Sequence, residues 1–408
     1  MNYKRNYFAL LITIAITTSV VMACKTDYTG TNVINIVRRP EPADFTISNI
    51  TVFPLEKIED FEFDVRSGDL SSDDLTGRIN DLLYTTYDSK TKWPEKLPEG
   101  FNPVEVMEIY KNPGLNLRKL HAQGITGKGV GIAIIDQTLL VDHIEYKDRI
   151  KLYEEYGEAA TYNAQMHGSA IASIAVGKTV GVAPEANLYY IAESVSTRDQ
   201  NNNTVYDFTI LANNIDRILE INKNLSETNK IRVISAPIGW NQENKGYKEI
   251  TEAVNRAKEA GIFVVSSSLY NTYGYMFHGL GKYPMSDADN FESYKPGSWW
   301  EENAEEIFRY KLSGDTPILL IPMEFRCTAA PNGVNDYVVY ASGGLSWSIP
   351  YIAGVYALAC QVEPDITYDE FWNIALETGK SVMVKGHDGK EYVMEKIINP
   401  EGIIESLK

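Results

Sequence analysis

The chain has 408 residues, of which 44% are hydrophobic and 11% aromatic, which is the composition of a folded rather than a disordered protein. This length allows one large α/β domain with an N-terminal appendage, or two domains. The formal net charge of -17 at pH 7 argues against a nucleic-acid partner, which favours a basic surface, and is typical of a soluble acidic one.

The N-terminus carries a targeting segment. Lys4 and Arg5 supply positive charge, and the apolar stretch that follows, residues 8–22, is short for a membrane span. It ends in Val21-Met22-Ala23-Cys24, which resembles a bacterial lipobox. We therefore predict a lipoprotein signal peptide over residues 1–23 and a diacylated Cys24 that tethers the mature protein to a membrane. A secretory signal with a coincidental cysteine, or an uncleaved anchor, fits the same stretch.

The next 90 residues show few regular patterns. Residues 24–45 are polar with several prolines and predict a tether. Residues 46–115 predict a small N-terminal module or a stalk. Within it, residues 69–83 have acidic side chains and leucines at a spacing typical of a helix.

From Gly124 onward, strand and helix signals alternate. Continuous apolar runs predict buried strands, and apolar residues spaced along one face predict helices. The expected strands are 130–135, 188–192, 231–236, 262–266, 317–322 and 336–341, and the expected helices are 168–176, 208–222, 248–260 and a stretch after residue 346. This alternation predicts an α/β fold with a doubly wound, mostly parallel sheet, whose chemistry lies at the carboxyl ends of the strands.

Three segments carry the residue types of acyl-transfer chemistry. Asp136 ends the first apolar run, His167 opens a helix of small residues, and Ser346 follows two glycines at a helix entry. A hydroxyl nucleophile needs a base to take its proton, and the base works best when a carboxylate holds its tautomer. A helix entry offers free N–H groups to a developing oxyanion. Taken singly, these residues fit a turn cap, a core histidine and a helix N-cap, but their order along the chain is one in which triads occur.

The sequence around these residues resembles the subtilisin family of serine peptidases from about residue 115 to 380. Three segments are similar to the family's aspartate, histidine and nucleophile motifs: 125–136, His167-Gly168 with the later Gly181-Val182-Ala183-Pro184, and 344–354. The resemblance implies a subtilisin-like peptidase domain over residues 116–408. In it, Asp136 orients the general base His167, and Ser346 attacks a peptide or protein substrate. No cofactor is required; structural calcium is compatible with the resemblance, but no ligand set is assigned.

The resemblance also suggests how the substrate binds. Ser235-Ala236-Pro237-Ile238-Gly239 takes the place of the strand edge that pairs with substrate backbone, which assigns Pro237, Ile238 and Gly239 to substrate binding. The family's oxyanion asparagine is not at its usual place after strand 262–266, and Asn271, one position late, is the nearest candidate. Loss of one such donor costs about 3 to 4 kcal/mol in the transition state. A weak or inactive homologue that binds peptides, and a solute-binding lipoprotein, therefore stay open.

Several further segments have two readings. Residues 270–316 are rich in aromatics and form either an insertion that shapes the substrate cleft or a surface loop. Cys327 and Cys360 either pair or are separate buried thiols. His278 has no partner motif and is expected to be structural. Residues 46–115 are either a propeptide-like region, whose removal would shed the domain from the membrane, or a retained stalk.

Overall fold

The computed structural model describes residues 34–43, 50–57, 62–198, 204–311 and 314–408. The predicted signal peptide, residues 1–23, and the predicted lipidation site, Cys24, lie outside these ranges.

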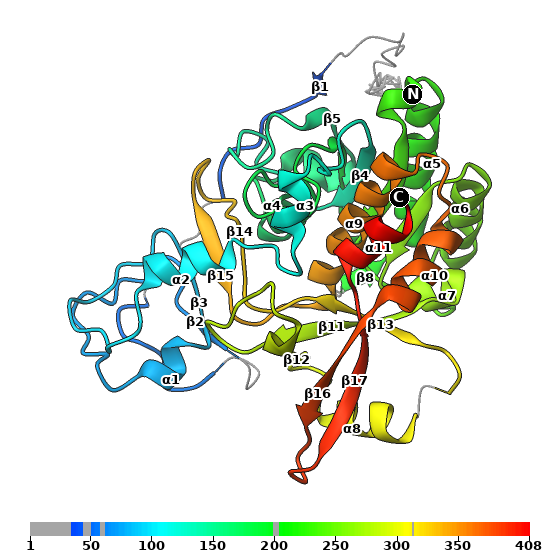
Figure 1. The fold of residues 1–408 in the computed structure, drawn as a ribbon. Coiled ribbons are helices and arrows are strands. Elements are labelled where there is room, and N and C mark those ends of the chain that lie inside the picture. Colours follow the sequence, from blue (N-terminus) through cyan, green and yellow to red (C-terminus); the bar gives the residue numbers. More distant parts are fainter. Residues whose placement is uncertain (1–33, 44–49, 58–61, 199–203, 312–313) are drawn as a thin grey trace, which may run out of the picture.

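The centre of the molecule is a six-stranded parallel sheet with the strand order β1-β5-β6-β4-β9-β10 (Figure 1). From one edge to the other its strands are β1 (Asn35–Ile36), β5 (Ile150–Glu155), β6 (Asn187–Ala192), β4 (Gly131–Asp136), β9 (Ile231–Ala236) and β10 (Phe263–Ser266). Strands β5 and β6 lie on one side of β4, and the later strands β9 and β10 lie on the other, so β4 separates the two halves of the sheet.

Helices cover both faces of this sheet. One face carries α4 (Met166–Val176) and α9 (Ser348–Val362), and the other carries α5 (Phe208–Lys223) and α6 (Tyr247–Glu259). Side chains of β4 alternate accordingly: Ile132 and Ile134 pack with the first pair of helices, and Ala133 and Ile135 with the second. The predicted doubly wound, mostly parallel α/β fold is confirmed.

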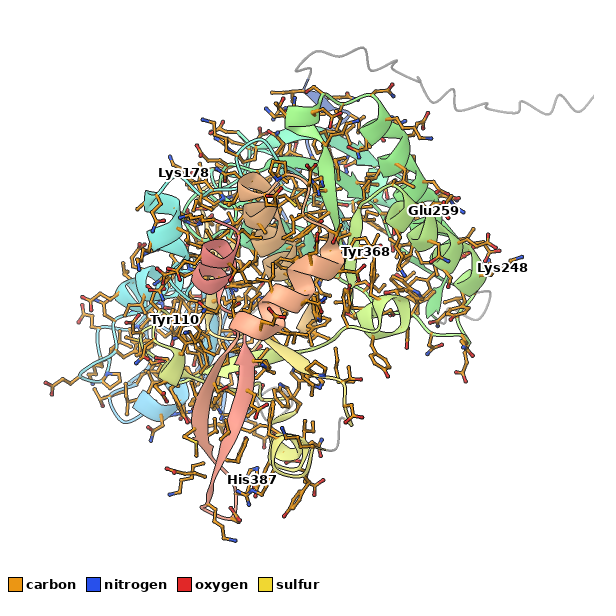
Figure 2. All side chains as sticks on the ribbon, turned by 45° about the vertical axis from the view of Figure 1, so that its right-hand side comes forward. Tyr110, Lys178, Lys248, Glu259, Tyr368 and His387 are labelled. Carbon is orange, nitrogen blue, oxygen red and sulfur yellow. The ribbon has the colours of Figure 1, made fainter. Side chains whose placement is uncertain are left out.

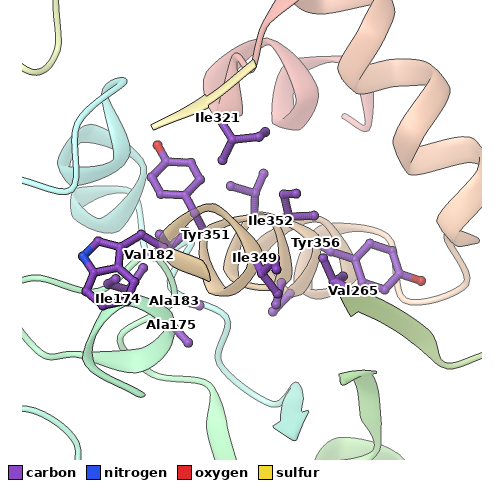
Figure 3. Packing of buried hydrophobic residues seen from close by; sticks show 14 of the residues in the cluster. Ile174, Ala175, Val182, Ala183, Val265, Ile321, Ile349, Tyr351, Ile352 and Tyr356 are labelled. Carbon is purple, nitrogen blue, oxygen red and sulfur yellow. The ribbon is translucent and has the colours of Figure 1, made fainter. Parts of the chain in front are cut away.

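The helix after Ser346 runs through the middle of the core. Figure 3 shows α9 with Ile349, Tyr351 and Ile352 packed among residues of neighbouring elements, including Val182 and Ile321. In the part of the chain that the structure describes, one helical stretch, Leu345–Val362, is long and apolar enough to cross a membrane, and 78% of it is buried inside the protein. Its apolar character therefore matches its position as the central core helix.

The aromatic-rich segment 270–316 belongs to a second sheet, which has five strands in the order β12-β11-β13-β17-β16. These are β12 (Tyr294–Pro296), β11 (Met276–Lys282), β13 (Ile318–Pro322), β17 (Glu391–Ile397) and β16 (Lys380–Lys385). The segment also supplies α7 (Leu269–Tyr273) and α8 (Glu301–Tyr310). Trp300 is buried and donates its indole N–H to the Gly279 carbonyl at 2.6 Å, so this region is a packed part of the fold rather than a surface loop.

The C-terminal region completes this second sheet. The β16–β17 hairpin extends away from the main sheet, with His387 in its turn (Figure 1, Figure 2). Helices α10 (Tyr368–Thr378) and α11 (Pro400–Ser406) flank the hairpin in the sequence, and a short hairpin elsewhere joins β7 (Ser196–Arg198) to β8 (Thr204–Tyr206).

The N-terminal region forms a four-stranded sheet together with the segment that precedes Ser346. The strand order is β14-β15-β3-β2, with β2 (Phe63–Asp64), β3 (Thr85–Asp88), β14 (Arg326–Ala329) and β15 (Tyr337–Tyr340). In Figure 1 the blue and cyan N-terminal elements lie beside the orange β14 and β15. The region also contains α1 (Ile79–Leu82), α2 (Pro103–Tyr110) and, at its end, α3 (Leu117–Ala122).

The helical spacing over residues 69–83 was misleading, because only α1 is helical there. Asp69 and Asp74 each accept a hydrogen bond from the backbone N–H two residues later, at 3.2 Å in both cases. Such turns compete with a helix for the backbone. Leu70 and Leu75 are buried, although neither of them lies in a helix.

Part of the predicted tether, residues 34–43, lies on the domain. Strand β1 pairs with β5 at the edge of the main sheet. Arg38 contacts both carboxylate oxygens of Glu155, at 2.6 and 2.8 Å, and the Ala43 N–H donates to the Pro331 carbonyl. The described part of the tether is therefore fixed to the sheet edge.

Candidate active site

The sheet and its first helix bring Asp136 and His167 together. Asp136 is the last residue of β4, and His167 is the second residue of α4. The His167 Nδ1 atom lies 2.8 Å from Asp136 Oδ1 and 2.9 Å from Oδ2. Asp136 Oδ1 also accepts the Gln137 N–H at 2.6 Å, which holds the carboxylate in place. A carboxylate that accepts from Nδ1–H leaves Nε2 of the imidazole as the free base.

The environment tunes this histidine. Burial by itself lowers the pKa of His167, but the negative charge of Asp136 and its hydrogen bond to the ring together outweigh burial. The pKa of His167 is therefore raised above its ordinary value of 6.5. The imidazolium form, which arises when a base takes a proton, is thus stabilised by Asp136.

Ser346 lies in a 3₁₀ turn, η4 (Leu345–Trp347), directly before α9. Its hydroxyl donates a hydrogen bond to the Pro237 carbonyl at 3.2 Å. Within the described ranges, no hydrogen bond joins Ser346 to His167. The ring of the next residue, Trp347, instead meets the His167 ring edge-on, with 5.4 Å between centroids.

A cleft of about 460 Å³ adjoins the Asp136–His167 pair. It is lined by the carboxyl ends of β4, β6 and β9 and by the segment that leads into α4, including Asp136, Gln137, Gln165, His167, Glu193, Pro237 and Ile238. None of its lining residues comes from segment 270–316. Segment 270–316 therefore does not form a wall of this cleft. As described above, it is not a surface loop either.

Glu193 is a cleft residue that the sequence analysis missed. It follows β6 as Asp136 ends β4, so the same strand-end pattern would have found it. Its carboxyl accepts a hydrogen bond from Asn214, and burial, with the nearby charge of Asp136, raises the pKa of Glu193 to about 8. Glu193 is therefore mostly protonated at neutral pH.

The predicted substrate-binding edge is partly occupied by internal hydrogen bonds. The Ile238 N–H donates to the Ala236 carbonyl at 2.7 Å, which makes a tight turn around Pro237. The Ile238 carbonyl accepts the Ser267 N–H at 3.0 Å. Pro237 and Ile238 line the cleft, whereas Gly239 does not. The Ile238 N–H and the carbonyl oxygens of Ala236, Pro237 and Ile238 are thus already hydrogen-bonded within the protein, and the assignment of Pro237, Ile238 and Gly239 to substrate binding stays a prediction.

Asn271 lies in α7 with its side chain exposed. It is not among the residues that line the cleft, and its side chain makes no hydrogen bond within the described part of the chain. Its assignment as an oxyanion donor stays a prediction. The Ser346 N–H, at the start of a helical segment, has no acceptor within that helix.

The remaining candidate side chains have structural positions. Cys327 and Cys360 are buried and unpaired, which answers the question of their pairing, and burial raises the pKa of the Cys360 thiol to about 12. His278 stacks on Trp300 with 4.8 Å between ring centroids, and burial lowers its pKa. Among the described residues, no group of three or more His, Cys, Asp or Glu side chains is arranged to hold a metal ion.

Part of the chain around this site matches a known protein family. Residues 127–287 match the Subtilase family (Peptidase_S8), a range that includes Asp136 and His167 and ends before Ser346. Together with the parallel sheet, this match establishes a subtilisin-like α/β fold and supports a subtilase.

Curated relatives have names of the same class. Minor extracellular protease Epr of Bacillus subtilis (strain 168) is 25% identical over 325 residues, which are 76% of this chain and 44% of that protein. Subtilisin-like protease 2 of Arthroderma otae is 31% identical over 140 residues, 34% of this chain and 30% of that protein. The chain spans less than half of the length of these relatives. The family match and these names are those of peptidases, to which this chain is similar over the matched residues.

Two solved structures align with most of this chain at low sequence identity. The Prenylagaramide maturation protease PagA aligns with a TM-score of 0.48 and 16% identity, over 72% of this chain and 98% of that one. The PatG macrocyclase in complex with peptide aligns with a TM-score of 0.46 and 16% identity, over 72% of this chain and 95% of that one.

Proposed function

We propose that this protein is an exported, membrane-tethered serine endopeptidase that hydrolyses peptide bonds through an acyl-enzyme on Ser346. The observation that carries the proposal is the pair of contacts from His167 Nδ1 to both oxygens of Asp136, at 2.8 and 2.9 Å, beside an open cleft. This arrangement supplies a base with a fixed tautomer, which a serine nucleophile requires.

In the proposed reaction, the Ser346 hydroxyl exchanges the Pro237 carbonyl for His167 Nε2 as its hydrogen-bond acceptor. Oγ then attacks the carbonyl carbon of the substrate while Nε2 takes the hydroxyl proton, and the Ser346 N–H stabilises the oxyanion. His167 gives the proton to the leaving amine, and the C–N bond breaks. Water, deprotonated by the same base, then attacks the ester. The bond between the acyl carbon and Ser346 Oγ breaks, His167 returns the proton to Oγ, and the acid product leaves. Catalytic hydrogen bonds are often absent or long before substrate binds, so the Pro237 contact is compatible with this role.

A reactive-serine probe tests this proposal. We expect a fluorophosphonate to label the wild-type protein on Ser346, and Ser346→Ala and His167→Ala to abolish labelling because one lacks the nucleophile and the other the base. Labelling is measured on purified protein by fluorescence and by mass spectrometry of the modified peptide. His278→Ala is the matched control, since His278 contacts Trp300 rather than the cleft.

An unlabelled but folded wild-type protein would contradict the peptidase function. It would favour the second candidate, a weak or inactive homologue that binds peptides at the same cleft. Two observations support that candidate: Ser346 is bonded to Pro237 instead of His167, and Asn271 is exposed on α7. In the same assay, Asn271→Ala would lower labelling about 10²-fold or more if Asn271 supplies the oxyanion donor.

Membrane tethering rests on the pattern Val21-Met22-Ala23-Cys24, and export is also consistent with the extracellular relative from Bacillus subtilis. We expect the full chain, expressed in a bacterium fed an alkyne fatty acid, to incorporate the label and to sediment with membranes. Cys24→Ala removes the acceptor thiol and should lose both properties. Cys327→Ala, which removes a buried thiol, should keep them. Fatty-acid labelling that persists in Cys24→Ala would contradict the anchor.

A further inference from the structure

We propose that Glu62 is a positioning residue for the nucleophile segment 342–346, and that the N-terminal strands β2 and β3 are a permanent part of the active protein rather than a removable propeptide. The catalytic consequence rests on the function proposed above, whereas the contact between Glu62 and Ser342 does not.

The N-terminal strands continue a sheet that leads to the nucleophile. Strand β3 pairs antiparallel with β15, with Asp88 opposite Val338 and Tyr87 opposite Val339. The Ser89 N–H also donates to the Tyr337 carbonyl at 2.9 Å. A pair of strands as short as β2 and β3 is not stable alone in water, so these strands depend on β15 and β15 gains a partner from them.

Side chains extend this pairing beyond the end of β15. The Thr86 hydroxyl oxygen accepts the Ala341 N–H at 3.0 Å, and Glu62 Oε2 accepts the Ser342 N–H at 3.0 Å. The Thr86 hydroxyl also donates to Glu62, which orients the carboxylate. Two successive backbone N–H groups ahead of the glycine turn are thus held by the N-terminal region.

The backbone of a neighbouring element also packs closely on the turn. A Cβ added at Gly343 would lie 2.7 Å from the Met323 carbonyl oxygen, so the chain passes too close to Met323 for any side chain there. The start of the nucleophile segment is therefore held by Glu62 at Ser342 and closely packed on Met323 at Gly343. Loss of the Glu62 contact would release this segment at Ser342 and leave a half-buried N–H without its acceptor.

A second line of contacts runs from the N-terminal region to the base. Arg66, paired with Asp64, lies over the Tyr340 ring at 5.6 Å. Tyr340 meets the Trp347 ring at 5.3 Å, and Trp347 meets His167 at 5.4 Å. The hydrophobic core is shared in the same way, because Phe63, Val65, Tyr87, Cys327, Val339 and Ala341 belong to one buried cluster. Removal of the N-terminal region would expose this cluster and release the support of both Ser346 and His167.

The test compares single-residue substitutions in the full-length chain, so that no segment is removed. Glu62→Ala removes the acceptor, while Glu62→Gln keeps an oxygen that can accept the Ser342 N–H. Asp73→Ala is the matched control, because Asp73 accepts the Phe53 N–H at 2.7 Å within the same region and makes no contact with the nucleophile segment. Two quantities are measured: hydrogen exchange of a peptide covering residues 340–347, and the rate of fluorophosphonate labelling.

We expect Glu62→Ala to increase exchange at this peptide and to slow labelling about tenfold or more, as loss of a hydrogen bond to a charged group implies. Glu62→Gln should restore most of the protection from exchange and most of the labelling rate. Asp73→Ala should leave the exchange and the labelling rate unchanged. If Glu62→Ala does not fold, Glu62→Asp, which withdraws the carboxylate by one methylene, should show the same slower labelling. Native mass spectrometry of the labelled wild-type protein should find residues 62–115 retained.

Unchanged exchange and labelling in a folded Glu62→Ala variant would overturn the positioning role. A labelled species without residues 62–115 would overturn the permanent role of the N-terminal strands. If the wild type is not labelled at all, the proposed peptidase function fails. Hydrogen exchange still tests whether Glu62 holds Ser342. Unchanged exchange in Glu62→Ala would overturn that contact, and increased exchange would support it.

Discussion

Asp136→Asn is expected to lower kcat/KM about 10⁴-fold at neutral pH, measured with any peptide that the wild type cleaves. Asp136 Oδ1 accepts the Gln137 N–H at 2.6 Å, and an asparagine oxygen would keep that bond. Its NH₂ group would then face His167 Nδ1, which lies 2.8 and 2.9 Å from the two oxygens of the present carboxylate. An NH₂ donor forces Nδ1 to accept, so Nε2 carries the proton and is no longer a base.

The same substitution should shift the pH profile. Activity needs neutral His167, so wild-type kcat/KM falls as the pH drops through a pKa that Asp136 raises above 6.5. Without the negative charge of Asp136, burial alone acts on the imidazole and lowers its pKa. The acid limb of the residual activity is therefore expected at lower pH in Asp136→Asn than in the wild type.

Asp142→Asn is a suitable control for both measurements. Asp142 lies in the loop that follows β4 but pairs with Arg39 at the surface, and surface ion pairs contribute little to stability. Its rate and pH profile should match the wild type. A fall of less than tenfold in a folded Asp136→Asn variant would show that the carboxylate does not set the tautomer of His167.

Gly168→Ala is expected to destabilise the protein by roughly 1–3 kcal/mol, the usual cost of overpacking a core. A Cβ at this position would lie 2.4 Å from the Gln137 carbonyl oxygen and 2.4 Å from the Tyr190 hydroxyl oxygen. Tyr190 is fully buried and donates to that same carbonyl, so neither atom has room to withdraw. The helix α4 must move away from the sheet and carry the adjacent His167 with it, which should also slow labelling of Ser346.

The direction of the change in unfolding free energy distinguishes a steric clash from the ordinary effect of alanine in a helix. Gly→Ala within a helix ordinarily stabilises by up to about 1 kcal/mol, so a loss reports the close approach of α4 to the sheet. Denaturant unfolding monitored by circular dichroism gives the free energy. Gly77→Ala is the control, because a Cβ there meets no atom within 4 Å, and its stability should not fall. Equal stability of Gly168→Ala and wild type would contradict the predicted clash.

Part of the site follows from local sequence. The apolar run before Asp136 predicts a buried strand, and the small residues after His167 predict a helix that approaches the sheet closely. Both elements form as expected, and the parallel topology then brings the carboxylate to the imidazole. Hydrophobic periodicity is a local property, which is why it predicts these elements without knowledge of the rest of the chain.

Local pattern failed where side chains compete for the backbone. The leucines of residues 69–83 have a helical spacing, yet Asp69 and Asp74 form turns and pair with Lys92 and Lys96, which lie more than 20 positions away. The spacing of apolar residues does not reveal which of these alternatives has the lower free energy.

The sequence by itself predicted four of the six strands of the main sheet and its principal helices, because these depend on local periodicity. The pairing of Asp136 with His167 was instead implied by the resemblance to the subtilisin family. Only the tertiary structure decided that Ser346 donates to Pro237, that Trp347 faces His167, and that Glu62 holds Ser342. These contacts join residues that are 109 to 280 positions apart, or depend on side-chain conformations within a turn, and no local pattern encodes either.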